Sequence, residues 1–316
     1  MNSPQYTFLL PAYKAKYFAE ALQSIKGQTY RDFKVIVSDD CSPEDLKSIY
    51  DKEVGDDSRF TYRRNEENMG SKSLVSHWNL LVDMCDTEYL IMASDDDIYA
   101  PNYLEGINYL VEKYPEVGVH RGRMEKWYMA DGKRYDDDSA SEKMTTLEYL
   151  YHKYTTAHQA GLQNFTFKLS ALKNIGGFVN FPLAWFSDDA TVLACSKKGV
   201  CYTKDVVFTM RISGENITCR SDRNTADQKL VATMLFGDWV YSFYESINDN
   251  STNESSIMST TVKEGIDNHI RRLAMDYYLS ASWIKALSLF EWMNRHHLLE
   301  SKHRYLKDYC RARILA

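Results

Sequence analysis

Three consecutive carboxylates, Asp95, Asp96 and Asp97, follow directly after the apolar run from Tyr89 to Ala93. Like charges at the end of a strand repel one another unless a cation or a hydrogen-bond network holds them. Mg²⁺ and Mn²⁺ take oxygen ligands and commonly share them with the phosphates of a substrate. The triplet is therefore a candidate site for a divalent cation and a diphosphate, although a solvated acidic turn has the same composition.

A second acidic pair ends an earlier apolar run in the same way. The stretch Phe33–Val37 leads into Ser38-Asp39-Asp40-Cys41-Ser42. If both runs are strands of one parallel sheet, their carboxyl ends meet at one edge, which is where such sheets bind ligands. The two acidic clusters together predict one binding site.

The elements that would position these acids alternate between strand and helix patterns. Apolar residues at helical spacing fall at 18–25, 74–85 and 104–111, and Ser42-Pro43 is expected to cap a helix that begins at Glu44. The strand-like runs are Tyr6–Leu10, Phe33–Val37, Phe60–Arg63, Tyr89–Ala93 and Val117–Arg121. This alternation predicts an α/β fold with a mostly parallel sheet flanked by helices.

The second half has a less regular pattern. Residues 131–143 are polar and acidic and are interpreted as a loop or insertion. A short helix from Thr145, a strand Asn164–Leu169 and a turn at Gly176-Gly177 are expected next. A helix should begin near Asp188, and two strands should follow up to Met210. From Asp222 onward the pattern is helical, with a polar linker at 248–256.

Composition narrows the class of protein. The chain has 316 residues, 44% hydrophobic and 26% charged, which suits one large globular domain with an appendage. The net charge of -6 argues against a nucleic-acid partner. The six cysteines show no metal-site spacing, which predicts a reduced protein. The sequence shows no signal-peptide pattern and no apolar stretch of membrane-helix length, which predicts a cytoplasmic protein.

Several motifs, in order along the chain, resemble family 2 glycosyltransferases of the Rossmann-like GT-A fold. The resemblance is specific from about residue 5 to 120 and looser to about Thr218; the last hundred residues match no family pattern. The matching segments are Leu10-Pro11-Ala12-Tyr13, Gln28-Thr29-Tyr30-Arg31-Asp32-Phe33, Val37-Ser38-Asp39-Asp40-Cys41-Ser42, Asn68-Met69-Gly70, Ser94-Asp95-Asp96-Asp97-Ile98-Tyr99-Ala100-Pro101, Gly176-Gly177-Phe178 and Ser187-Asp188-Asp189.

The resemblance implies a nucleotide-sugar donor. Pro11, Ala12 and Tyr13 would lie against the nucleotide base, with the tyrosine ring stacking on it. Asp40, next to Asp39, would accept a hydrogen bond from a base such as uracil or thymine. The residues implied to bind the nucleotide are Pro11, Ala12, Tyr13, Asp39, Asp40, Lys72, Asp95 and Arg211. For Lys72, simple solvent exposure is the favoured alternative.

The resemblance also implies a Mn²⁺ or Mg²⁺ site on the acidic triplet. The usual D-x-D-D pattern reads Ser94-Asp95-Asp96-Asp97 here, so serine replaces its first acid. Asp96 becomes the expected lead ligand and Asp95 is assigned to the ribose or to a metal-bound water. Asp97 is the second expected ligand, or alternatively a helix cap or a supporting group.

The catalytic base implied by the family is the second acid of a pair that opens a helix. Asp189 is therefore the expected base and Asp188 its partner, although either residue near that helix start could simply cap it. Arg211, in a segment that resembles the family's closing loop, is expected to face the diphosphate. Ser213 stands where many relatives have a histidine, which leaves the third metal ligand open.

The expected organisation is a glycosyltransferase domain at 1–220, with a nucleotide half at 1–120 and an acceptor half at 121–220. A helical extension at 221–316 would follow. These helices are interpreted as a cap on the catalytic domain, with a homodimer interface or a peripheral contact with the inner face of the membrane near Arg295 and Lys302 as alternatives.

The expected function is an inverting transfer of one sugar, UDP- or dTDP-linked, to a hydroxyl of a saccharide or lipid-linked acceptor in surface polysaccharide assembly. Three alternatives were weighed. A nucleotidyltransferase would need a glycine-rich loop after the first strand, and a D-x-D-x-T phosphatase would need a threonine after the acids; the sequence has neither. A catalytically decayed fold that only binds nucleotide or carbohydrate stays open.

Overall fold

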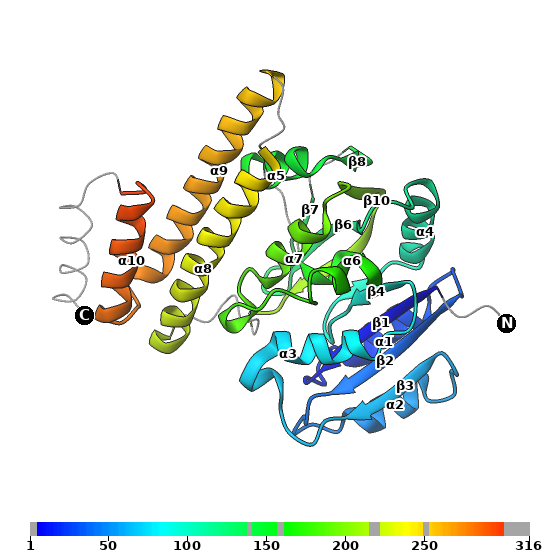
Figure 1. The fold of residues 1–316 in the computed structure, drawn as a ribbon. Helices are drawn as coiled ribbons and strands as arrows, with labels where there is room; N and C mark the ends of the chain where they lie inside the picture. The colour runs from blue at the N-terminus through cyan, green and yellow to red at the C-terminus, as the bar shows by residue number, and fades with distance from the viewer. Residues whose placement is uncertain (1–4, 138–140, 157–160, 215–221, 249–252, 300–316) are drawn as a thin grey trace. The chain divides into compact units, whose positions relative to one another are not determined.

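The computed structural model describes residues 5–137, 141–156, 161–214, 222–248 and 253–299. It contains a ten-stranded sheet in the order β3-β2-β1-β4-β9-β6-β10-β5, with β7 paired to β6 and β8 paired to β10. Figure 1 shows the strands of this sheet with helices against them. The strands are β1 (Tyr6–Ala12), β2 (Phe33–Asp39), β3 (Phe60–Arg64), β4 (Tyr89–Met92), β5 (Ile98–Tyr99), β6 (Val119–Tyr128), β7 (Arg134–Asp136), β8 (Lys143–Met144), β9 (Phe165–Lys168) and β10 (Val200–Ile212).

The expected α/β class with a mostly parallel sheet is confirmed. Strands β1 to β4 pair only in parallel with one another, and β10 runs parallel to β6. Strand β9 is antiparallel to both of its neighbours, β4 and β6. The carboxyl ends of β1, β2 and β4 therefore meet at one edge of the sheet, as the acidic clusters required.

The helices form where apolar residues recur at helical spacing. In α1, Phe18, Ala21, Leu22 and Ile25 are all buried, so one stripe of the helix packs into the core. The helices are α1 (Phe18–Lys26), α2 (Leu46–Val54), α3 (Gly70–Asp83), α4 (Tyr103–Lys113), α5 (Thr146–Thr155), α6 (Leu169–Asn174), α7 (Ser187–Cys195), α8 (Arg223–Asn248), α9 (Asn253–Tyr278) and α10 (Trp283–Arg295), with short 3₁₀ turns η1 (Leu162–Asn164) and η2 (Pro182–Ala184).

Local details differ from three expectations. Helix α2 begins at Leu46 and its cap is Asp45, whose carboxylate accepts the N–H of Ser48, so the Ser42-Pro43 cap is wrong. The predicted pair of strands before Met210 is one strand, β10, with register shifts between Tyr202 and Phe208. Residues 134–136 form β7, a hairpin partner of β6, within the segment interpreted as a loop.

Other expectations in the second half are confirmed. Thr145 caps α5 through a capping box with Glu148. Gly176 and Gly177 adopt φ values of +85° and +92°, which a residue with a side chain rarely reaches. Helix α7 begins at Ser187, next to Asp188.

The chain divides into two compact units, Met1–Asn180 with Ser187–Gly214, and Phe181–Phe186 with Glu215–Ala316. The second unit is built on α8, α9 and α10, as the helical pattern after Asp222 predicted. Helix α9 already begins at Asn253, so the polar linker is shorter than 248–256. Lys302, part of the expected basic surface, lies outside the described residues, as does 215–218 of the segment resembling the closing loop.

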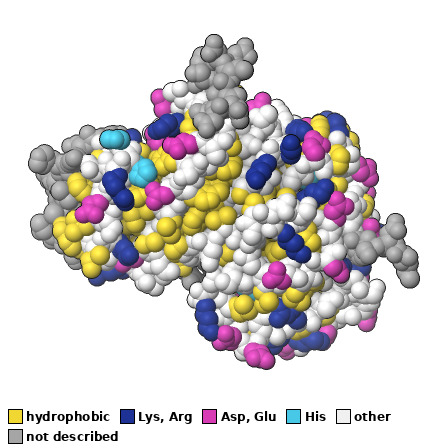
Figure 2. Space-filling view, viewed as in Figure 1, with side chains coloured by type: hydrophobic (Ala, Val, Ile, Leu, Met, Phe, Trp, Pro, Cys, Tyr) yellow, Lys and Arg dark blue, Asp and Glu magenta, His cyan; other side chains and the backbone are white. Residues whose placement is uncertain are grey.

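The helical unit has a buried core and an apolar exposed surface. Phe186 stacks on Phe236 at a ring-centroid distance of 4.4 Å, and Trp292 donates its indole N–H to Asp238 at 2.8 Å. In Figure 2, apolar side chains gather over α8 to α10. The exposed large ones in this unit are Leu235, Leu279, Trp283, Ile284 and Leu287. Among the described helices, none is long and apolar enough to cross a membrane.

Candidate active site

Asp95 links the acidic triplet to the loop after β1. Its Oδ2 accepts the backbone N–H groups of Tyr13 and Lys14, each at 2.7 Å. Burial raises the pKa of Asp95 to about 6, while these two N–H bonds oppose the rise. The charge of Asp96 adds to the rise and that of the Lys14 ammonium opposes it. Lys14 is thus a cation beside the triplet that the sequence analysis had not singled out.

Asp97 is buried and ties the triplet to β10. Its Oδ1 accepts the N–H of Arg211 at 2.9 Å, and its Oδ2 accepts the Ser94 hydroxyl at 2.6 Å. Burial and the neighbouring Asp96 charge raise the pKa of Asp97 to about 7. Each oxygen of Asp97 therefore accepts one hydrogen bond from within the protein, and these bonds hold the acidic loop against β10.

Asp96 lies between these two structural acids and is only partly buried. Burial raises the pKa of its carboxyl, and the Ser94 hydroxyl together with the charges of Lys14 and Arg211 opposes the rise. The structure therefore leaves Asp96, the expected lead ligand, as the acid of the triplet best placed to serve a ligand.

Arg211 is enclosed rather than exposed to a diphosphate. Its guanidinium packs between the rings of Tyr17 and Trp127, 4.5 and 5.6 Å from their centroids. It donates to the backbone carbonyl of Asp96 at 3.1 Å and forms an ion pair with Glu20. In the structure this side chain supports the acidic loop from inside, and the expectation that Arg211 faces the diphosphate stays untested.

Asp39 is also fully buried. Its Oδ1 accepts the N–H of Ser42 at 2.8 Å, and its Oδ2 accepts the Tyr62 hydroxyl at 2.6 Å and pairs with Arg64. These bonds hold the turn after β2, where Cys41 has a φ of +55°. Asp39 therefore shapes the turn from inside, and the structure does not place it as a direct nucleotide contact.

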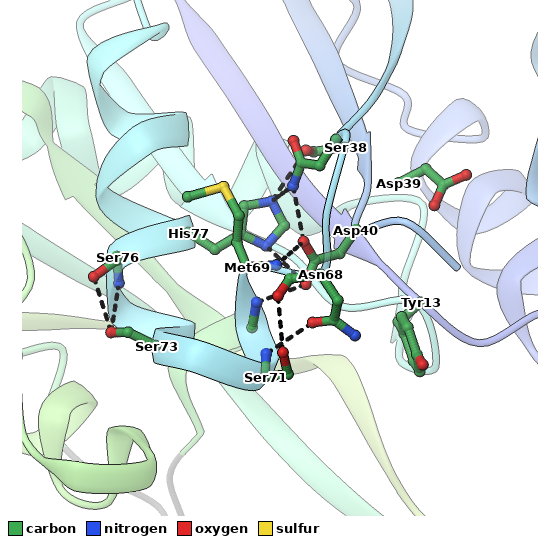
Figure 3. A network of polar contacts seen from close by, with 12 residues as sticks. Tyr13, Ser38, Asp39, Asp40, Asn68, Met69, Ser71, Ser73, Ser76 and His77 are labelled. Carbon is green, nitrogen blue, oxygen red and sulfur yellow. Dashed lines mark hydrogen bonds and ion pairs between the residues drawn. The ribbon is translucent and has the colours of Figure 1, made fainter. Parts of the chain in front are cut away.

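Asp40 lies at the centre of the network in Figure 3. Its Oδ1 accepts the N–H of Met69 and the side-chain amide of Asn65, both at 2.8 Å, and its Oδ2 accepts the N–H of Gly70 at 2.7 Å. The side chain is 7% exposed. Because Oδ2 takes a single N–H, it keeps acceptor capacity that a base N–H could use.

His77 completes this network and was not singled out from the sequence. Its Nε2 lies 3.0 Å from the Ser38 hydroxyl and 3.2 Å from the amide of Asn65 (Figure 3). Burial lowers the pKa of His77, although the charge of Asp40 opposes the shift. A neutral imidazole therefore packs behind the turn. A lone histidine on the apolar face of α3 carries no sequence signal of such a role.

The loop after β1 places the expected base-stacking residue at the surface. The Tyr13 side chain is 41% exposed, while its carbonyl accepts the Ser42 hydroxyl at 2.6 Å. Ala12 is buried and its carbonyl accepts the N–H of Asp40 at 2.9 Å; Pro11 precedes it in β1 and is partly buried. A fixed backbone with an open ring suits stacking against a planar ligand.

Lys72 does not join the cluster. Its ammonium pairs with Glu67 at 2.6 Å, and its side chain is 65% exposed. The alternative of simple solvent exposure describes this position, and nothing in the structure directs Lys72 toward the acidic triplet.

Asp188 and Asp189 lie in the first turn of α7 and belong to a second polar cluster. Asp189 Oδ1 accepts the ammonium of Lys153, from α5, at 2.5 Å. Burial raises the pKa of Asp188 to about 7, with a further rise from the charge of Asp189 and an opposing effect of Lys153. One acid of the pair is therefore ion-paired and the other titrates near neutrality, where a general base works best.

The donor set at the triplet fits a divalent cation that is shared with a ligand. In the described part of the chain, no group of three or more His, Cys, Asp and Glu side chains is arranged to hold a metal ion alone. Mg²⁺, however, usually takes one or two carboxylates and completes its shell with waters and substrate phosphates. Asp96 and Asp95 supply two adjacent carboxylates, which is the number that such a shared site requires.

Comparisons with known proteins agree with this geometry. The model of Glycosyl transferase family 2 matches residues 7–176. A Campylobacter jejuni protein named GalNAc(5)-diNAcBac-PP-undecaprenol beta-1,3-glucosyltransferase is 23% identical over 172 residues, which are 51% of this chain and 54% of that protein. The putative colanic acid biosynthesis glycosyl transferase WcaA of Escherichia coli is 29% identical over 106 residues, 33% of this chain and 36% of that protein. The chain thus spans about half or less of the length of these curated relatives.

Solved structures share the fold over nearly the whole chain. S. aureus TarS in complex with UDP-GlcNAc superposes with a TM-score of 0.65 at 16% identity, covering 98% of this chain and 81% of that one. The mannosyltransferase PcManGT of Pyrobaculum calidifontis in complex with GDP-Man and Mn²⁺ superposes with a TM-score of 0.55 at 16% identity, covering 98% and 84%. At these identities the likeness concerns the fold.

Proposed function

Since the chain belongs to glycosyl transferase family 2 and adopts the GT-A fold, we propose that it transfers one sugar from a nucleotide sugar to an acceptor hydroxyl. The observation that carries the proposal is the single connected cluster at the carboxyl edge of the sheet. Asp95 joins the acidic triplet to the Tyr13 loop, and that loop in turn is bonded to the turn after β2. An exposed aromatic ring and clustered carboxylates lie within one rigid framework.

The donor is proposed to be UDP- or dTDP-linked. The Tyr13 ring would stack on the base, and Asp40 Oδ2 would accept its N–H, as uracil and thymine allow. Asp95, rather than Asp39, is the acid whose bonds to backbone N–H groups set the position of the Tyr13 loop. Asp39 and Arg211 support the site from behind without touching the nucleotide.

Asp96 and Asp95 would hold a Mn²⁺ or Mg²⁺ ion, which would supply positive charge next to the leaving diphosphate. Lys14 adds a fixed cation at the same edge of the sheet, since its charge acts on both acids. Asp97 keeps the loop attached to β10 while the substrate binds.

The transfer is proposed to invert the anomeric centre by direct displacement. The acceptor oxygen forms a bond to the anomeric carbon, the bond from that carbon to the diphosphate oxygen breaks, and the acceptor proton passes to the Asp188–Asp189 pair. Asp189, the family-type base, uses one oxygen for Lys153 and keeps the other for the acceptor. A base within hydrogen-bond reach contributes about 10²–10⁴-fold to the rate.

The acceptor is proposed to be a saccharide or a lipid-linked saccharide in surface polysaccharide assembly. The names of two relatives, a PP-undecaprenol glucosyltransferase and a colanic acid biosynthesis transferase, support this class. A cytoplasmic protein that docks at the inner face of the membrane would meet such an acceptor. The exposed apolar side chains of α10 agree with peripheral docking or with a homodimer.

The direct test of the chemistry is Asp189→Asn. We expect nucleotide affinity near that of the wild-type protein and a loss of transfer of about 10²-fold or more, because the substitution removes the base and not the donor site. Transfer is measured as nucleoside diphosphate release with a panel of acceptors, and affinity by calorimetry. Asp86→Asn, at an exposed acid paired with Lys34, is the matched control. Normal turnover in Asp189→Asn would contradict the base assignment.

A further inference from the structure

Helices α5 and α7 are tied at both ends. At one end, the Thr146 hydroxyl donates to the carbonyl of Ser196, the residue directly after α7, at 2.5 Å. At the other end, Lys153 in the last turn of α5 meets Asp189 in the first turn of α7. The two helices therefore lie antiparallel, and the second tie consists of a single ion pair.

This ion pair is placed where both helices favour its charges. The amino-terminal turn of a helix stabilises anions, and the carboxyl-terminal turn stabilises cations. Asp189 lies in the amino-terminal turn of α7, and Lys153 lies in the carboxyl-terminal turn of α5. The two side chains are only 17% and 9% exposed, so water screens the pair weakly.

The other charged groups around the pair are already balanced. Arg121 and Asp137 form a fully buried ion pair of their own. Lys126 is the remaining cation close to this region, and burial lowers its pKa. Among the described residues, the titratable groups whose charges interact with Lys153, Asp188 or Asp189 include Tyr149 and Tyr154 of α5, Lys126 of β6 and Tyr202 of β10. Arg121 and Asp137 in turn interact with Tyr149, Lys126 and Tyr202. Lys153 is therefore the cation in direct contact with the carboxylate pair.

We propose that Lys153 is a positioning residue for sugar transfer, which fixes one oxygen of Asp189 and holds the Asp188–Asp189 pair in a singly charged state that can accept the acceptor proton. This inference rests on the proposed function and extends it to a residue outside the acidic motifs. Without the cation, two adjacent, partly buried carboxylates would retain protons to a higher pH and would not act as a base near neutrality.

The electrostatics of the cluster agree with this role. Burial lowers the pKa of Lys153, but the charges of Asp189, Tyr154 and Asp188, together with the hydrogen bond to Asp189, outweigh burial and raise that pKa above its ordinary value. Lys153 stays charged as a result. Asp188, with a pKa raised to about 7, carries the variable proton of the pair.

The experiment compares Lys153→Gln, which keeps a hydrogen-bond donor and removes the charge, with Lys153→Arg, which keeps the charge. The carboxyl carbons of Asp188 and Asp189 are followed by ¹³C NMR during a pH titration of the full chain, with Asp188→Asn and Asp189→Asn for assignment. We expect proton release from the pair to move up by at least about one pH unit in Lys153→Gln and to stay near the wild-type range in Lys153→Arg. Lys113→Met is the charge-matched control. Lys113 is the last residue of α4, and the substitution breaks its exposed ion pair with Glu142, so it should leave the titration unchanged.

The activity readout is the acidic limb of the pH–rate profile, which should move in the same direction as the NMR titration. An unchanged titration in folded Lys153→Gln would overturn the inference while leaving the transferase proposal intact. If the wild-type protein transferred no sugar, the proposed function would be wrong. The NMR titration would still show whether Lys153 lowers the pH at which Asp188 and Asp189 release their protons. If Lys153→Gln does not fold, Asp189→Asn provides the test, because Asp188 then faces the cation alone and should release its proton at lower pH than in the wild type.

Discussion

At the residue scale, neighbouring carboxylates of one motif have different tasks. In the triplet, Asp95 and Asp97 accept backbone N–H groups from other segments and so determine where those segments lie. Asp96 is the acid proposed as the lead ligand of the cation. The same division recurs at α7, where Asp189 takes the Lys153 ammonium and Asp188 is left with a pKa near 7. A motif written as consecutive acids does not reveal this division.

The pKa of Asp188 leads to a prediction about stability. Its folded-state pKa of about 7 lies above the ordinary value of 3.8, so its contribution to folding is fully present below about pH 4 and is lost as the pH rises through 7. Asp188→Asn has no ionisable group at this position and so does not lose stability as the pH rises. We therefore expect the free energy of unfolding of the variant, relative to the wild type, to improve between pH 5 and pH 8 by at most about 3 kcal/mol, because about two pH units separate pH 5 from the folded-state pKa and each is equivalent to about 1.4 kcal/mol.

Urea denaturation of both proteins at the two pH values measures this difference. Taking the variant relative to the wild type cancels His77 and His120, whose lowered pKa values act in the opposite direction. A relative stability that is the same at pH 5 and pH 8 would show that Asp188 does not titrate in this range.

At the residue scale, the sequence predicts the acidic motifs but not the contacts that their side chains make. The sequence analysis identified both acidic clusters and the Asp188–Asp189 pair, because strand ends and helix starts place them. It assigned Arg211 to the diphosphate, but the guanidinium is enclosed between aromatic rings that come from distant segments. Lys153 was missed because it is 36 residues away from Asp189, and no local pattern links the two.

At the element scale, strong hydrophobic patterns predicted strands and helices, whereas their ends depended on local hydrogen bonds. Strand β10 was expected as two strands because Thr203-Lys204-Asp205 interrupts its apolar residues. In the structure the Thr203 hydroxyl accepts the N–H of Arg123 and donates to the carbonyl of Asp205, which satisfies polar groups at the irregularity and lets the strand continue.

The start of α2 was misplaced for a similar local reason. The side chain of Asp45, and not that of Ser42, accepts a backbone N–H in the first turn of α2, that of Ser48.

The start of α3 depends on Asp40. Its carboxylate accepts the N–H groups of Met69 and Gly70, at the beginning of the helix, and the helix is interrupted again at Ser73, whose φ is -159°. A buried acceptor that holds two backbone donors and the Asn65 amide fixes this segment relative to β2. The segment resembling the family's Asn68-Met69-Gly70 motif thus owes its position to the acidic pair after β2.

We expect Asp40→Ala to lower the free energy of unfolding by about 2–4 kcal/mol, because it leaves buried donors without an acceptor. It should also weaken nucleotide binding and reduce the preference for UDP over GDP and ADP. Denaturant unfolding measures the first effect and calorimetry the second. Asp45→Ala, which removes an exposed helix cap on α2, is the control and should reduce stability less than Asp40→Ala does, without changing nucleotide preference. An unchanged preference in Asp40→Ala would rule out its contact with the base.

At the scale of the whole molecule, the chain consists of a GT-A unit and a helical unit, and the proposed chemistry lies in the first. The sequence predicted the helical nature of the last hundred residues but not their purpose, because apolar residues at helical spacing describe a buried core and an exposed docking face equally well. Trp283 and Ile284 are exposed in the structure, and their spacing in the sequence does not distinguish them from buried residues. The central claim can be tested on the full chain without knowledge of the acceptor.

The most direct measurement is calorimetric titration of UDP, dTDP, GDP and ADP into the protein, first with Mn²⁺ and then with EDTA. The wild-type protein should bind UDP or dTDP, binding should weaken when EDTA removes the ion, and Asp96→Ala should behave with Mn²⁺ as the wild type does with EDTA. Binding of UDP without turnover of any UDP- or dTDP-sugar would support a fold that has lost catalysis. No binding of any of the four nucleotides would contradict the proposal that this edge of the sheet is a nucleotide-sugar site.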